Sequence, residues 1–173
     1  MLIKFVGVIL IFVGTIGMTE HYCGDRKRRI EWMKKLCHMF QVIISEITYK
    51  KADMPDSFLF AADRTDAELS EFLLSVCEEW KKKNGTTLHE IWAQKVEECF
   101  TKTYIKKTDL EQLTHLGEQI GYQDREMQIS ILRLYTEELF RSIEESVKTY
   151  TEVKRISRVA GVFAGAVIVV LLI

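Results

Sequence analysis

The chain has 173 residues, of which 47% are hydrophobic and 28% are charged, and its formal net charge is −1. This length suits one domain, and a single proline and nine glycines are too few to punctuate a many-stranded sheet. The near-balance of charge argues against a nucleic-acid partner. The composition therefore predicts an all-α protein.

Both ends of the chain are strongly apolar. Residues 2–18 carry one charge, Lys4, and residues 159–173 carry none. As helices these segments would be about 25 and 22 Å long, against a bilayer core of about 30 Å. We therefore expect transmembrane anchors at 1–19 and 159–173 around a helical bundle at 20–158. A cleaved signal peptide is the alternative for the first segment, although no Ala-x-Ala-like site precedes Glu20.

Basic residues flank each apolar end on the side of the central region. They are Arg26, Lys27, Arg28 and Arg29 after the first segment, and Lys148, Lys154, Arg155 and Arg158 before the second. By the positive-inside rule the central region is cytoplasmic and both termini lie outside. A central region outside the cytoplasm is the weaker alternative.

Apolar residues of the central region recur every three or four positions, which is the spacing of one helix face. The pattern predicts six helices. The first runs from Lys27 to Tyr49, a short second one follows Pro55, and the last begins near Met127 and meets no breaker before the C-terminal segment. We expect them to pack as antiparallel neighbours joined by short loops.

Three Thr-x-x-Glu sequences have the pattern of a capping box, in which a threonine and a glutamate satisfy the first amides of a helix. They begin at Thr65, Thr87 and Thr108. Each predicts the start of a helix, and Gly85 and Gly121 are expected to end the helices before them.

No residue pattern indicates catalysis or cofactor binding. His89-Glu90 lacks the second histidine of a zinc-protease motif, and Glu111 with His115 is not repeated as a di-iron site requires. The four cysteines have no CxxC spacing, so we expect free thiols. We therefore expect a protein without enzymatic activity, metal or cofactor.

Small residues occur in both predicted anchors. Gly7 and Gly14 lie in the first, and Gly161 and Gly165 form a GxxxG pattern in the second. Small residues let transmembrane helices approach closely. We expect a helix–helix contact there, either within the chain or between copies in a homo-oligomer.

Several motifs are similar to those of the stage III sporulation protein AB family over essentially the whole length. They are Ser45-Glu46-Ile47-x-Tyr49 before Met54-Pro55, Leu116-Gly117-Glu118-x-Ile120-Gly121-x-x-Asp124 with Gln128, and Tyr150-x-x-x-Lys154 leading into Val159-Ala160-Gly161-Val162 and the apolar end. The sequence departs from the family pattern at Pro55-Asp56 and Arg158-Val159. The chain thus resembles this family, whose members are similar to the cytoplasmic helical domain of inner-membrane platform proteins in type II secretion and type IV pili.

The resemblance implies a platform or adaptor in the mother-cell membrane around the forespore. Its partners would be a secretion-type sporulation ATPase, of the stage III sporulation protein AA type, other membrane proteins of the same channel complex, and membrane lipid. The alternative is a membrane-tethered regulatory module that binds an unrelated cytoplasmic protein.

The corner between the fifth and sixth helices is the candidate partner site. It contains Gly117, Gly121 and Asp124, in the part of the central region that most resembles the family. We expect Gly121 to adopt a left-handed backbone conformation. Asp124 either contacts the partner or only caps the sixth helix.

Overall fold

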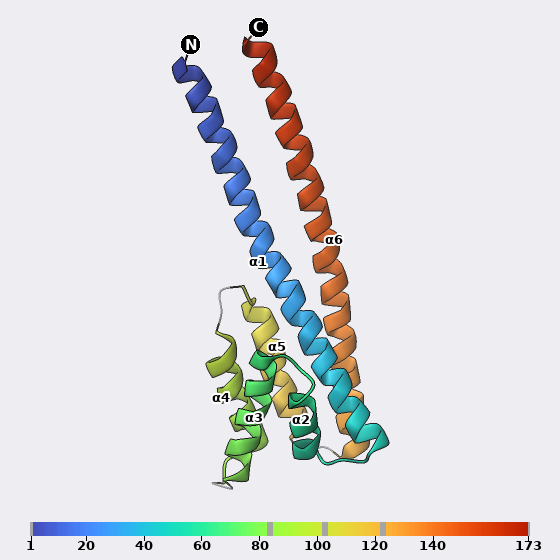
Figure 1. The fold of residues 1–173 in the computed structure, drawn as a ribbon. Coiled ribbons are helices and arrows are strands. Elements are labelled where there is room, and N and C mark those ends of the chain that lie inside the picture. The colour runs from blue at the N-terminus through green and yellow to red at the C-terminus, as the bar shows by residue number, and fades with distance from the viewer. Residues whose placement is uncertain (1, 83–84, 102–103, 122–123, 173) are drawn as a thin grey trace. The chain divides into compact units, whose positions relative to one another are not determined.

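The computed structural model describes the backbone of residues 2–82, 85–101, 104–121 and 124–172, and the side chains within 24–82, 85–101, 104–121 and 124–156. These residues form six helices and no strand: α1 (Leu2–Tyr49), α2 (Met54–Ala62), α3 (Ala67–Lys81), α4 (Leu88–Phe100), α5 (Lys107–Ile120) and α6 (Arg125–Leu172) (Figure 1). The all-α prediction is confirmed.

The two terminal helices are the longest of the six, and α1 is longer than the sequence predicts. α1 has 48 residues and begins at Leu2 rather than Lys27, so the predicted N-terminal anchor is part of the same helix. α6 also has 48 residues and includes the C-terminal segment, as expected from the absence of a breaker. Both terminal segments thus belong to helices of the bundle rather than to additional helices, and their crossing of a membrane stays a prediction.

The chain divides into two compact units. One comprises Met1–Ile30 with Glu144–Ile173, and the other comprises Glu31–Ile143. Within the described side chains, no helix has a stretch long and apolar enough to cross a membrane. The predicted anchors, with Gly7, Gly14, Gly161 and Gly165, lie outside those side chains.

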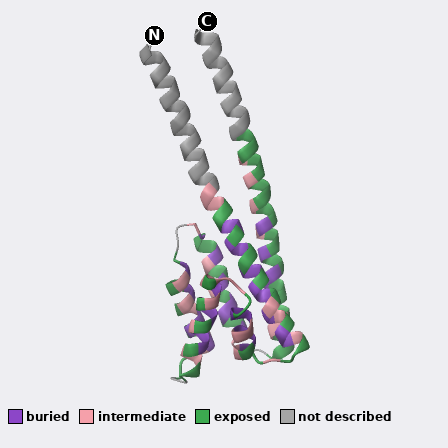
Figure 2. Cartoon of the chain, viewed as in Figure 1, coloured by how far each residue is buried: buried purple, intermediate pink, exposed green. Residues whose placement is uncertain are grey.

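In the unit Glu31–Ile143, helices adjacent in sequence are also adjacent in space: α2 packs on α3, α3 on α4 and α4 on α5. Phe40 of α1 contacts aromatic rings of two other helices. Its ring centroid lies 6.4 Å from that of Trp92 in α4 and 5.2 Å from that of Tyr135 in α6. The α1 segment therefore lies between α6 and the shorter helices. Among the described side chains, most buried positions belong to this unit (Figure 2).

An ion pair between Lys35 Nζ and Asp66 Oδ2, 2.5 Å long, joins α1 to the start of α3. Asp66 is the N-cap of α3 by its backbone, but its side chain makes no capping hydrogen bond. The capping box predicted at Thr65 is therefore wrong, because α3 starts one residue later than the box requires, with Asp66 and not Thr65 as its N-cap.

The box at Thr87 is confirmed. Thr87 Oγ1 accepts from the Glu90 amide, and the Thr87 amide donates to Glu90 Oε2 at 2.8 Å. The Glu90 carboxylate accepts from the Thr87 amide and also from the Thr87 hydroxyl, and these two hydrogen bonds hold the pKa of Glu90 below its usual range. The box predicted at Thr108 is wrong, since α5 begins at Lys107 with Lys106 as N-cap. The loop after α3 does reach a left-handed conformation, at Gly85 with φ +80°.

Candidate functional site

Trp92 of α4 contacts four other helices and lies at the centre of the bundle core. It is fully buried, and its ring packs against one phenylalanine from each of the first three helices: Phe40, Phe58 and Phe72. Its indole Nε1–H donates to the Leu113 carbonyl of α5 at 2.7 Å. A buried tryptophan needs such an acceptor, so α5 is held at one height along α4.

Gly117 lies directly on this ring. A β-carbon at Gly117 would stand 2.4 Å from Trp92 Cδ1 and 2.6 Å from Cγ, distances that real β-carbons do not adopt. Only glycine therefore allows α5 to approach α4 at this point. Gly117 is itself buried, so it positions the neighbouring surface and offers no side chain to a partner.

Gly121 ends α5 as predicted, but in a right-handed conformation with φ −71° and ψ −29°. The expected left-handed conformation is wrong, because α5 ends in a simple right-handed turn. A β-carbon there would meet only ordinary contacts, the nearest being the Gly117 carbonyl oxygen at 3.6 Å. Neither backbone conformation nor space requires glycine at this position.

Asp124 caps α6. Its Oδ1 accepts from the Met127 amide at 2.8 Å, and its carbonyl accepts from the Gln128 amide at 2.9 Å. The Gln128 side chain in turn donates to the Ile120 carbonyl at 3.1 Å, which ties the start of α6 to the end of α5. The capping role is confirmed, and since Asp124 remains exposed, partner contact stays a prediction.

The exposed side chains at this junction form what we call the acidic corner, defined by Glu118, Asp124, Glu126 and Met127. Glu118 is bracketed by two histidines, with His115 Nδ1 at 3.0 Å and His89 Nε2 at 3.9 Å from its carboxylate oxygens. Met127 is 48% exposed. Exposed carboxylates and an exposed thioether are groups that can bind a basic, partly apolar surface through ion pairs and apolar contact.

Arg125, the one cation of this turn, is already engaged. Its Nη2 lies 3.3 Å from Asp53 Oδ1 in the connection between α1 and α2. The pair leaves the corner with a net negative charge. It also joins two connections of the bundle that are 72 positions apart in the chain.

The remaining candidates for chemistry are metal-ligating side chains and cysteine thiols. Among the described side chains, no three histidines, cysteines or acids gather as a metal site. Cys37 and Cys77 are buried free thiols and Cys99 is partly buried, while Cys23 lies outside the described side chains. Burial raises the pKa of the Cys77 thiol to about 11.

Neither the central position of Trp92 nor the two histidines beside Glu118 can be predicted from local sequence. Trp92 appears in the sequence as one apolar position among several, and nothing local links it to Gly117, which is 25 positions away. His89 and His115 belong to different helices, so their approach to one carboxylate is set only by the pairing of α4 with α5.

The fold defines an all-α protein with two 48-residue helices at its ends and four shorter helices between them. The chain belongs to the stage III sporulation protein AB family, whose model matches residues 4–173. The family resemblance read from the sequence is thereby confirmed.

A solved structure supports the fold. A chain described as stage III sporulation protein AB is similar with a TM-score of 0.63 and 19% sequence identity, over 72% of this chain and 97% of the solved one. Comparison with curated protein sequences finds no match.

Proposed function

We propose that this protein is a non-enzymatic adaptor of the sporulation channel between mother cell and forespore. Its terminal segments anchor it in the mother-cell membrane, and the bundle lies in the cytoplasm, where it binds the secretion-type ATPase. The observation that carries the proposal is the family match, which extends from residue 4 through the apolar C-terminal segment to residue 173.

The course of α6 suggests how binding is coupled to the membrane. One helix begins next to the acidic corner at Arg125 and continues through the predicted C-terminal anchor to Leu172. An ATPase that binds the corner would therefore contact the helix that enters the membrane. The connection between the corner and the predicted anchor is helical throughout, because α6 is continuous from Arg125 to Leu172.

The acidic corner can be tested without damaging the fold. Asp124→Asn removes the charge and keeps the cap, since asparagine and aspartate cap helices equally well. We expect the full-length protein in detergent to bind the ATPase about two- to fivefold more weakly with this change, the range for one exposed ion pair. Glu78→Gln, on the exposed surface of α3, is the matched control and should leave affinity unchanged.

Unchanged affinity in Asp124→Asn, Glu118→Gln and Glu126→Gln together would remove the corner from the proposal. No binding by the unmodified protein would favour the regulatory-module alternative.

Topology is tested separately by single added cysteines in a Cys23→Ser, Cys99→Ser background. A cysteine at either terminus should react with a membrane-impermeant thiol reagent in intact cells, and one placed between residues 66 and 150 should not. Labelling of the middle from outside would contradict any contact with a cytoplasmic ATPase.

A further inference from the structure

Charge is divided unequally between the two units of the chain. Residues 31–143 contain 15 basic and 20 acidic residues, whereas 1–30 with 144–173 contain nine basic and five acidic residues. The net charges are therefore −5 and +4. An anionic surface would therefore attract the terminal segments and repel the bundle. The overall charge of −1 hides this difference, because the two unit charges nearly cancel.

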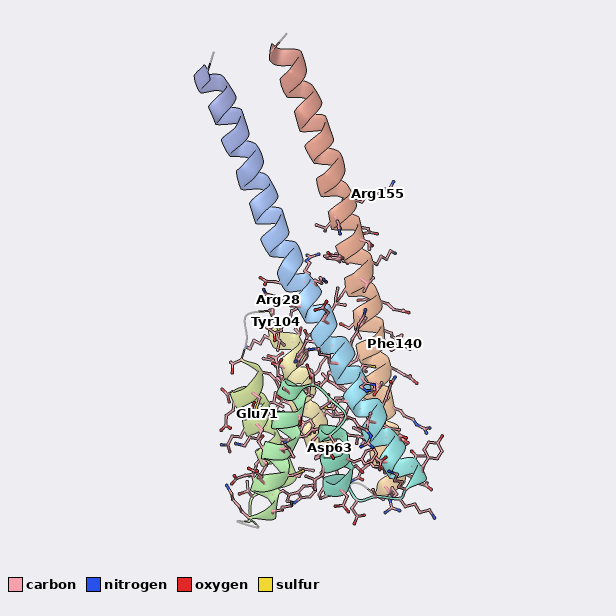
Figure 3. The ribbon with its side chains drawn as sticks, in the orientation of Figure 1. Arg28, Asp63, Glu71, Tyr104, Phe140 and Arg155 are labelled. Atoms are coloured by element: carbon pink, nitrogen blue, oxygen red, sulfur yellow. The ribbon has the colours of Figure 1, made fainter. Side chains whose placement is uncertain are left out.

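Three cations at the end of the described part of α6 have no acidic partner among the side chains that the structure describes. Lys148, Lys154 and Arg155 are exposed, and among the described side chains none of them forms an ion pair. Lys154 lies over the Tyr150 ring, with Nζ 5.9 Å from its centroid. Arg155 extends away from the helix (Figure 3).

Their spacing suits the boundary of a membrane. At 1.5 Å per residue, Arg155 and Lys154 lie about 6 to 8 Å along α6 from Val159, where the apolar segment begins. The headgroup layer on each side of the hydrocarbon core is about 5 to 8 Å thick. Ile156, next to Arg155, is 67% exposed, which is costly in water and favourable at the acyl boundary.

α1 adds positive charge to the same unit. Arg29 is buried and donates to Ser146 Oγ at 2.8 Å, which holds α1 against α6 at this level. Arg28 is 70% exposed, and Asp25 lies 4.0 Å from its guanidinium, a loose contact within one helix turn. The exposed guanidinium of Arg28 can therefore also attract a second anion.

We propose that this basic collar, defined as Arg28, Lys148, Lys154 and Arg155, binds the phosphate headgroups of anionic phospholipids. Lys154 and Arg155 contact the headgroups directly, while Lys148 and Arg28 attract them from within about one Debye length. The proposal rests on the membrane anchoring of the proposed function. It adds selectivity for anionic lipids to that anchoring.

The experiment uses the full-length protein in vesicles of phosphatidylcholine with 30% phosphatidylglycerol. Spin-labelled phosphatidylglycerol and phosphatidylcholine are added in turn, and the fraction of each lipid immobilised by the protein gives the selectivity. We expect phosphatidylglycerol to be preferred, and each cation lost at the surface should reduce the preference by up to about fivefold.

The triple variant Lys148→Gln, Lys154→Gln, Arg155→Gln should abolish most of this preference. Its control, Lys51→Gln, Lys81→Gln, Lys106→Gln, removes the same charge from exposed positions of the bundle and should retain it. Raising the salt concentration from 0.05 to 0.5 M should weaken the preference of the unmodified protein, because exposed charges are screened. Inorganic phosphate at millimolar concentration should not compete, since the site is a lipid surface.

Two failures can be told apart. If the protein resists extraction by alkaline carbonate but shows equal immobilisation of both lipids, or if the two triple variants behave alike, the collar proposal is overturned while anchoring stands. If the protein is extracted by carbonate, the anchoring on which it rests is wrong.

Discussion

Gly117→Ala is the substitution whose effect the structure defines most sharply. The new methyl group would lie 2.4 Å from Trp92 Cδ1, about 1 Å closer than an ordinary contact. Trp92 cannot retreat, because it is enclosed by three phenylalanine rings and bonded to the Leu113 carbonyl at 2.7 Å. Overpacking costs about 1 to 3 kcal/mol, and a buried indole left without its acceptor costs a similar amount.

One effect acts in the opposite direction. Replacing glycine by alanine inside a helix gains about 1 kcal/mol of helix propensity. We therefore expect a net loss of about 2 kcal/mol in the free energy of unfolding, and a rearranged indole environment. Thermal unfolding of the full-length protein in detergent, followed by circular dichroism and tryptophan fluorescence, measures both.

Gly121→Ala is the matched control, because Gly121 lies four positions later, at the C-cap of the same helix. Its β-carbon has ordinary contacts and its φ of −71° suits any residue, so stability should change by less than about 0.5 kcal/mol or rise slightly. If Gly117→Ala were as stable as Gly121→Ala, the close packing of α5 on Trp92 would be wrong.

Three further predictions follow from the capping box and the thiols. Thr87→Ala should lower the stability by about 1 kcal/mol, whereas Thr108→Ala should be nearly neutral, because Thr108 lies inside α5; equal effects in thermal unfolding would contradict the helix starts. The pKa of Glu90 is depressed in the fold, so its contribution is present at neutral pH and is lost as the pH falls through that pKa. The stability difference between the unmodified protein and Glu90→Gln should therefore shrink on acidification, and a constant difference would refute this. Cys77, with a pKa of about 11, should resist an aromatic disulfide reagent at pH 8 until the protein unfolds, while the less buried Cys99 reacts earlier; simultaneous reaction, read by peptide mapping, would contradict the burial.

Local pattern was a good guide wherever the signal is a few adjacent residues. The apolar periodicity located all six helices, because burial of one face constrains every third or fourth residue. The Thr87 box was found because both of its hydrogen bonds join residues three apart. The end of α5 was also predicted from a local signal, the glycine at position 121.

Local pattern misplaced the start of α3 by one residue. Thr65-Asp66-Ala67-Glu68 reads as a capping box with Thr65 as the N-cap, yet the N-cap is Asp66, whose carboxylate pairs with Lys35, 31 positions earlier. The segment before Lys27 was separated from α1 because its composition changes, although hydrogen bonding within a helix depends little on whether its side chains are apolar or charged.

The sequence by itself determined the all-α class, the order of the helices and the family, because periodicity, breakers and motif spacing are all written along the chain. Only the tertiary structure decided what the residues of the corner do. Gly117 is buried against a tryptophan of another helix, and Gly121 has a right-handed backbone conformation. Asp124 caps α6 through one of its two carboxylate oxygens. Such roles depend on how closely α4, α5 and α6 approach, and that distance is set by the packing of side chains that lie far apart in the sequence.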